Sequence, residues 1–146
     1  MNVFVLNGPS LNLLGEREPH IYGTATLEEV KEACSRKASS LGLTVDFRQT
    51  NEEGEIVTWL QEARTGADAV IINPAAFTHY SLAVRDAIEA SGKPTVEVHI
   101  SNIFAREEFR AKSVVSPVAR GVIAGLGVDG YLLAIEAVAG ILGREG

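Results

Sequence analysis

The sequence predicts an α/β domain built around a mostly parallel β-sheet. Apolar runs of strand character alternate with segments of helical period along the whole chain, which is the pattern of parallel βα units. One run, at 67–73, is continuously apolar, as expected for a central strand buried on both faces. A chain of 146 residues forms one core but not two comfortable ones, so we expect a single domain over residues 1–146.

The first fifty residues predict two strands with a helix between them. "NVFVL" at 2–6 has the apolar character of a strand. A helix over 26–42 is indicated by a capping box of Thr26 and Glu29 and by a single apolar stripe. Residues 43–50 then alternate in polarity, which predicts a strand with one less protected face.

The rest of the chain continues this alternation. Helical spacing of apolar residues predicts three further helices: 55–66, 80–92 and 129–143. Short apolar runs predict three further strands: 67–73, 94–101 and 120–126. Five strands in a βα series fit a flavodoxin-like three-layer sandwich with a five-stranded parallel sheet.

Composition and charge exclude several classes of protein. No apolar run approaches the roughly 20 residues that span a bilayer, and the N-terminus lacks the pattern of a signal peptide. Cys34 is the only cysteine, so no internal disulfide can form and we expect a cytoplasmic location. The formal charge of -6 argues against nucleic acid as a partner, but a few arginines can still bind a small anionic substrate.

Polar residues follow three of the predicted strands. The segments that leave the first, third and fourth strands read "NGPSLN", "NPAAFTH" and "HISN". Ligands of such sheets bind beyond the carboxyl ends of the strands, where the chain order reverses. We therefore expect amides, histidines and hydroxyls to form a site at this edge.

Tyr22 and Arg17 lie in one loop between Gly15 and Gly23. Tyrosine ordinarily ionises near pH 10, and a neighbouring guanidinium favours the phenolate, which would make Tyr22 a base. The alternative is a surface loop whose arginine and glutamate side chains are merely solvated.

Glu97 and His99 stand two residues apart on a predicted strand, so their side chains point to the same face. A carboxylate beside an imidazole stabilises the imidazolium and fixes its orientation, which suits a general acid. The alternative is a core histidine paired with a buried glutamate.

His79 and Asp86 are seven residues apart, so we expect them to share a face of the helix predicted over 80–92. With Asn73 just before them, they form a polar set suited to binding hydroxyl groups. A capping histidine and a solvated aspartate are the alternative for each residue taken alone.

Arg106 and Arg110 are one helical turn apart and follow "HISN" closely. Either could form surface ion pairs with the glutamates between them, or bind a substrate carboxylate. The three histidines and the single cysteine are not spaced like metal ligands, and no glycine-rich phosphate loop is present, so we expect neither a metal nor a nucleotide cofactor.

Four segments, "NGPSLNLLGEREPHIYG", "NPAAFTHYSLAVRDA", "VEVHISNIFAREEFR" and "VIAGLGVDGY", together closely resemble the type II 3-dehydroquinate dehydratases, the small cofactor-free dehydroquinases. The resemblance covers essentially the whole chain. It implies a flavodoxin-like subunit of a dodecamer, a tetramer of trimers. It also implies conversion of 3-dehydroquinate to 3-dehydroshikimate and water, in the shikimate route to aromatic amino acids or in quinate catabolism.

The resemblance also implies a role for each matching residue. The base falls on Tyr22, the arginine that activates it on Arg17, and the acid that protonates the departing hydroxyl on His99, which Glu97 would orient. The implied substrate-binding positions are Asn73, His79, Asp86, the backbone of Ile100 and Ser101, and Arg110. The family position that corresponds to Asp86 can reach a neighbouring subunit's site.

This chain departs from the family pattern at two places. It has Ser10 where the family usually has asparagine, and Ala75-Ala76 where at least one glycine is common. The asparagine is thought to help hold the oxygen on which enolate charge develops. Serine keeps one donor but is shorter, so we expect an active enzyme in which a bridging water fills the gap.

Two other functions fit parts of the sequence. Ser10, His79 and Asp86 supply the residues of a Ser-His-Asp hydrolase, although "NGPSLN" is not a G-x-S-x-G elbow. A non-catalytic flavodoxin-like binding protein that drifted from the enzyme is the second alternative, but retention of Arg17, Tyr22 and His99 argues against drift.

Overall fold

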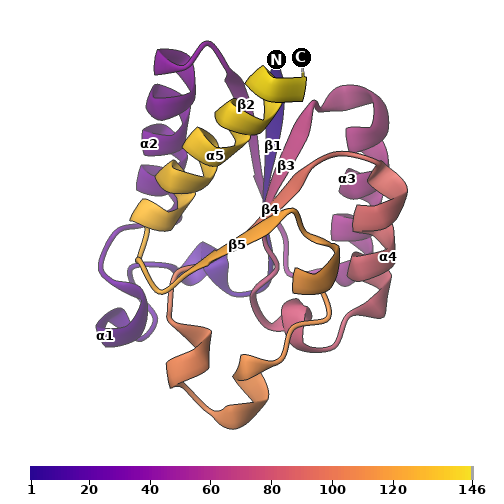
Figure 1. Ribbon diagram of the computed structural model, residues 1–146. Coiled ribbons are helices and arrows are strands. Elements are labelled where there is room, and N and C mark those ends of the chain that lie inside the picture. Colours follow the sequence, from indigo (N-terminus) through magenta and orange to yellow (C-terminus); the bar gives the residue numbers. More distant parts are fainter. Residues whose placement is uncertain (146) are drawn as a thin grey trace.

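Five parallel strands form the centre of the computed structural model, which describes residues 1–145 (Figure 1). The strands are β1 (Asn2–Asn7), β2 (Thr44–Gln49), β3 (Ala69–Asn73), β4 (Thr95–His99) and β5 (Gly121–Ala124). Their order in the sheet is β2-β1-β3-β4-β5. This order belongs to flavodoxin-like folds and confirms the predicted fold class.

Two helices cover each face of the sheet. One pair is α2 (Leu27–Ser40) and α5 (Asp129–Glu145), and the other is α3 (Glu53–Gly66) and α4 (Leu82–Ser91). Figure 1 shows the two pairs on opposite sides of the strands. The capping box at the start of α2 is confirmed, because the Thr26 hydroxyl accepts the backbone N–H of Glu29 at 3.2 Å.

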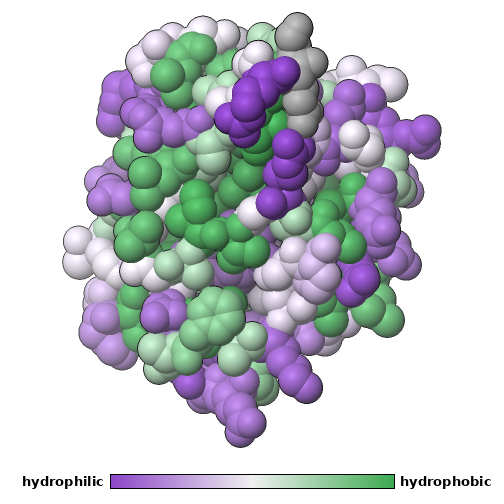
Figure 2. All heavy atoms as spheres, in the orientation of Figure 1, coloured by the Kyte–Doolittle hydropathy of each residue, from purple (hydrophilic) through white to green (hydrophobic). Residues whose placement is uncertain are grey.

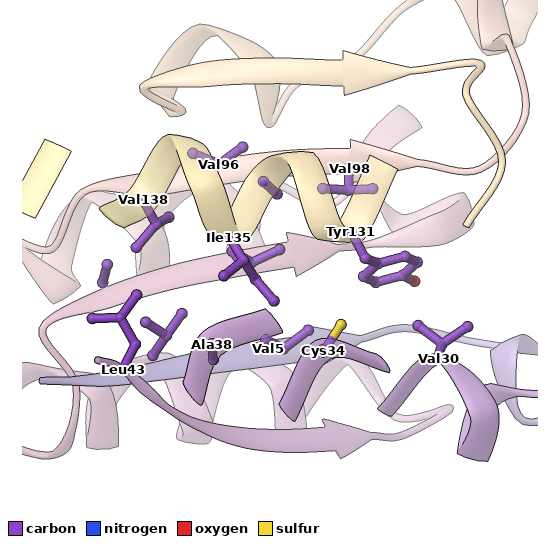
Figure 3. Close-up of a cluster of buried hydrophobic side chains, with 14 of the residues drawn as sticks. Val5, Val30, Cys34, Ala38, Leu43, Val96, Val98, Tyr131, Ile135 and Val138 are labelled. Atoms are coloured by element: carbon purple, nitrogen blue, oxygen red, sulfur yellow. The ribbon is translucent and has the colours of Figure 1, made fainter. Parts of the chain in front are cut away.

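The hydrophobic core divides into two clusters because β1 and β3 are buried on both faces. The cluster under α2 and α5 contains Cys34, Tyr131 and Ile135 (Figure 3). The cluster under α3 and α4 contains Ile56 and Val84. Burial raises the pKa of the Cys34 thiol to about 12, so this side chain acts as a packing residue.

Short helices fill the loops at the carboxyl ends of the strands. They are η1 (Leu11–Leu13), α1 (Pro19–Tyr22), η2 (Ala75–His79), η3 (Ile103–Ala105), η4 (Glu108–Ala111) and η5 (Ser116–Val118). The loop expected between Gly15 and Gly23 therefore contains a short helix, α1, which ends at Tyr22. None of the helices in residues 1–145 is both long and apolar enough to cross a membrane.

Candidate active site

A small cleft of about 150 Å³ opens beyond the carboxyl ends of β1, β3 and β4. Its wall includes nine of the eleven residues predicted from sequence or resemblance: Ser10, Arg17, Tyr22, Asn73, His79, His99, Ile100, Ser101 and Arg110. Glu97 lies directly behind His99. The expected edge of the sheet therefore carries the site, as the reversal of strand order between β1 and β3 requires.

The His99 imidazole is held by a fully buried carboxylate. Its Nε2 lies 2.5 Å from Oε2 of Glu97, and the two side chains are 6% and 0% exposed. Both residues belong to β4 and point to the same face, as their spacing predicted. This contact uses Nε2, which leaves Nδ1 as the ring nitrogen for chemistry in the cleft.

Three hydroxyl groups surround the same carboxylate. Ser116 donates to Oε1 at 2.5 Å, and Thr78 donates to Oε2 at 2.5 Å. Because the single Thr78 hydrogen goes to Glu97, Ser113 donates its own hydrogen to the Thr78 oxygen at 2.6 Å, and it accepts the backbone N–H groups of residues 115 and 116. The result is a relay from the backbone through two hydroxyls to Glu97.

This arrangement keeps Glu97 ionised. Burial acts to raise the pKa of its carboxyl, but the hydrogen bond and charge of His99, with the hydroxyls of Ser116 and Thr78, outweigh burial and hold the pKa below its usual value. An ionised Glu97 stabilises the imidazolium of His99, which is the form that can donate a proton.

Two arginines flank Tyr22 at the end of α1. Nη1 of Arg106 donates to the phenolic oxygen at 2.9 Å, and the Arg106 guanidinium carbon lies 5.4 Å from the ring centroid. The guanidinium carbon of Arg17 also lies 5.4 Å from this centroid. Arg17 therefore contributes its charge over the ring, while Arg106 makes the hydrogen bond to the oxygen that would ionise.

Arg106 is the residue that sequence reasoning left undecided and the structure assigns to the cleft. Besides Tyr22, it donates to the Ser101 hydroxyl at 3.2 Å. Arg110 also lines the cleft and is bonded to Glu107 on its own segment. The "FAREEFR" spacing left each arginine open between a surface ion pair and a substrate carboxylate, and the resemblance assigned substrate binding to Arg110 alone.

His79 lies at the end of η2, and its Nδ1 bonds the backbone carbonyl of Lys112 at 2.7 Å. A carbonyl only accepts, so Nδ1 carries the hydrogen and Nε2 of the neutral ring remains an acceptor. Such a nitrogen can accept a substrate hydroxyl.

The expectation that His79 and Asp86 share a helical face is wrong. The Ser81 hydroxyl caps Val84, so α4 begins at Leu82 and His79 precedes it. Asp86 is exposed on α4 and does not line the cleft of its own chain. His79 is bonded to Lys112 instead, so the Ser-His-Asp hydrolase loses its geometric basis.

Ser10 occupies the cleft wall with a left-handed backbone, at φ 69° and ψ -4°. Its N–H donates to Oδ1 of Asn51 at 3.0 Å. The hydroxyl makes no capping bond to η1, so it remains available to the cleft.

The carboxylates, histidines and cysteine of residues 1–145 form no group of three that could hold a metal ion. The functional side chains that sequence reasoning missed are Thr78, Ser113 and Ser116. Their hydroxyls carry no motif, and only the folded position of Glu97 brings them together.

The fold and this cleft define an α/β enzyme equipped for proton transfer, with a tyrosine beside two arginines and a histidine backed by a buried glutamate. Residues 1–139 match the family described as Dehydroquinase class II, and the chain belongs to that family.

Relatives and solved structures agree with this membership. The chain is 54% identical to the 3-dehydroquinate dehydratase of Pelotomaculum thermopropionicum, over 98% of this chain and 99% of that protein. It is 56% identical to the enzyme of the same name from Brucella canis, over 98% and 91%. The type II dehydroquinase of Propionibacterium acnes superposes with a TM-score of 0.92 at 47% identity, over 95% and 96% of the two chains.

Proposed function

We propose that this protein is a 3-dehydroquinate dehydratase, which eliminates water from 3-dehydroquinate to give 3-dehydroshikimate in the shikimate pathway of aromatic amino acid biosynthesis. The observation that carries the proposal is the pairing, in one cleft, of Tyr22 bonded to Arg106 with His99 bonded to Glu97. Family membership and relatives above 50% identity support the choice of substrate.

Tyr22 acts as the base of the first step. Its phenolate removes a proton from the carbon next to the ketone, and the electrons of the broken C–H bond move to the ketone oxygen to form an enolate. Arg106 donates a hydrogen bond to the oxygen that carries the phenolate charge, and the guanidinium groups of Arg106 and Arg17 both lie over the ring.

His99 acts as the acid of the second step. The enolate collapses, the C–O bond to the β-hydroxyl breaks, and the imidazolium of His99 protonates the departing oxygen so that it leaves as water. Glu97 keeps the ring oriented, and His99 is left as a neutral imidazole after it has donated the proton. Return of the proton from Tyr22 to His99 through solvent completes the cycle.

Substrate binding uses the polar wall of the cleft. The carboxylate is bound by the Ile100-Ser101 backbone and by Arg110, and the ring hydroxyls are bound by Asn73 and His79. A water held by Ser10 donates to the enolate oxygen where charge develops.

Assembly completes the site in this proposal. The subunits form a dodecamer, a tetramer of trimers, and Asp86 of one subunit contributes to the cleft of a neighbour. Large apolar side chains remain exposed on the single chain, including Tyr80, Leu82, Phe104 and Phe109, each at least 59% exposed. Figure 2 shows a further apolar area across the face between α5 and β5, where Val122 and Leu133 are exposed. Such surfaces are typical of subunit contacts. We place the enzyme in the cytoplasm.

The test is direct. Purified protein mixed with 3-dehydroquinate should develop the ultraviolet absorbance of a conjugated enone. The Tyr22→Phe variant, which keeps the ring but loses the ionisable oxygen, should lose this activity while its thermal unfolding is unchanged. Near-native kcat in Tyr22→Phe would remove Tyr22 as the base, and an inactive wild type would overturn the proposed reaction.

A further inference from the structure

Two asparagine side chains lie next to each other at the carboxyl ends of β1 and β3, where Asn7 and Asn73 are register partners. Tyr131 from α5 bridges them. Its hydroxyl donates to Oδ1 of Asn7 at 2.7 Å and accepts from Nδ2 of Asn73 at 2.9 Å. The three residues are 0%, 3% and 0% exposed for Asn7, Asn73 and Tyr131. Figure 3 shows Tyr131 on α5, at the end of the core toward which the strand arrows point.

The donor and acceptor of every hydrogen bond in this series are fixed. Nδ2 of Asn7 donates to the Arg48 carbonyl at 3.0 Å, so Asn7 can offer only its oxygen to Tyr131. The phenol has one hydrogen and gives it to Asn7, so its oxygen must accept from Asn73. Oδ1 of Asn73 then accepts the N–H of Ala75 at 3.1 Å. The Arg48 carbonyl and the Ala75 N–H therefore fix the two ends of this series of hydrogen bonds.

This series of hydrogen bonds determines which donor and acceptor of the Asn73 amide remain free to bind a ligand. After the bonds to Tyr131 and Ala75, its amide retains one N–H and one lone pair, and the residue lines the cleft. A hydroxyl group both donates and accepts, and so matches this remaining pair. Burial raises the pKa of the Tyr131 phenol above its ordinary value, so Tyr131 stays a neutral bridge.

We propose that Tyr131 is a positioning residue which, through the fixed chain from Arg48 to Asn73, orients the Asn73 amide for recognition of a substrate hydroxyl. Tyr131 does not line the cleft, so it acts through Asn73 on substrate binding rather than on the proton transfers. The identity of the substrate rests on the proposed function, whereas the orientation of Asn73 does not.

Tyr131→Phe tests the proposal with two measurements. In the free protein, the side-chain amide signals of Asn73 in ¹⁵N NMR should shift and exchange faster with solvent, because the amide loses its acceptor. With 3-dehydroquinate, KM should rise about tenfold with kcat within about threefold, since one hydrogen bond of binding is lost and the chemistry is untouched. A matched control is Ile135→Val, on the same helix and in the same core cluster, which should change neither KM nor the Asn73 signals.

A second variant tests the same proposal if Tyr131→Phe fails to fold. Asn7→Ala removes the link that fixes the direction of the chain, although Asn7 does not line the cleft, and should raise KM by a smaller factor. Unchanged Asn73 signals in these variants, an unchanged KM, or an equal rise of KM in Ile135→Val would each overturn the proposal. A wild type without activity on 3-dehydroquinate would instead contradict the proposed function, and the NMR measurement would still decide the orientation.

Discussion

At the scale of single residues, Ser10 has a strained backbone conformation and also lies in the wall of the cleft. Its φ of 69° is left-handed, a conformation that asparagine adopts several-fold more readily than serine. The residue also lines the cleft where enolate charge would develop. Asparagine, usual in the family at this position, would satisfy both demands better than serine does.

Ser10→Asn should therefore raise the free energy of unfolding by about 0.5 kcal/mol, because asparagine adopts the left-handed conformation more readily. It should also raise kcat, because the longer amide reaches the enolate oxygen directly. The gain in kcat should stay below about 10³-fold if, as proposed, a bridging water serves the natural serine. Urea unfolding and the absorbance assay measure the two effects. A gain above a thousandfold would mean that the natural Ser10 site is nearly inactive.

Ala75 is a second left-handed residue, at φ 51°, where the chain turns from β3 into η2. Ala75→Gly should raise the free energy of unfolding by about 0.5–1 kcal/mol, because relief of about 1–2 kcal/mol of strain exceeds the added entropy of the unfolded chain. Ala76→Gly is the matched control: its φ is not positive, so the same change should destabilise. If both variants lose stability alike in urea, Ala75 stores no strain.

Residues of the site differed in how far sequence could predict them. Tyr22, His99 and Glu97 were predicted because a motif or a two-residue spacing on a strand marks them. Arg106 was left open because an arginine among glutamates also fits a solvated surface. Ser113 and Ser116 were missed because nothing local connects them with Glu97, which they contact only after the chain has folded.

At the scale of elements, the segment 112–116 at the start of η5 holds the Glu97–His99 pair in place. Ser116 donates to Glu97 of β4, Ser113 reaches the same carboxylate through the Thr78 hydroxyl, and the Lys112 carbonyl accepts from His79 of η2. The segment thus connects η4, which carries Arg110, with the end of β4. Stability of this contact depends on the charge of Glu97.

The sign of the pH dependence follows from the lowered pKa of Glu97, below its ordinary 4.5. Its contribution to stability is complete above about pH 4.5 and is lost as the pH falls through the lower, folded-state pKa. Ser116→Ala should therefore cost about 1.5–3 kcal/mol at pH 6, and its cost should decrease as the pH falls through the folded-state pKa of Glu97.

Urea unfolding of both proteins at pH 6 and at successive steps below pH 4.5 measures this difference. Ser91→Ala is the control, because the buried Ser91 hydroxyl donates to a neutral backbone carbonyl and its loss should cost the same at every pH. A cost of Ser116→Ala that decreases at no pH below 4.5 would contradict the stabilising role of an ionised Glu97.

At the scale of the whole molecule, the sheet order explains why so much of the fold was predictable. Strands buried on both faces read as continuous apolar runs, and amphipathic helices read as single stripes, so the sequence pattern predicted all five strands and the four long helices. The short helices α1 and η1 to η5 escaped prediction because three to five residues are too few for a period to emerge.

The assembly gives the last prediction. Asp86 is exposed on α4 and absent from the cleft of its own chain, although the family pattern assigns it to substrate binding. If it serves a neighbour, then one complete site needs Tyr22 from one subunit and Asp86 from another. Asp86→Ala and Tyr22→Phe should each be inactive or nearly so when assembled alone.

Hybrid particles of the two variants, refolded together in equal amounts, should recover activity, because some clefts then combine an intact Tyr22 with an intact Asp86 from the adjoining subunit. Random mixing gives about a quarter of the wild-type sites. The size of the particles, about 190 kDa for a dodecamer of 15.6 kDa chains, is checked by light scattering. If Asp86 acts within its own subunit, no hybrid contains an intact site, and mixing restores nothing.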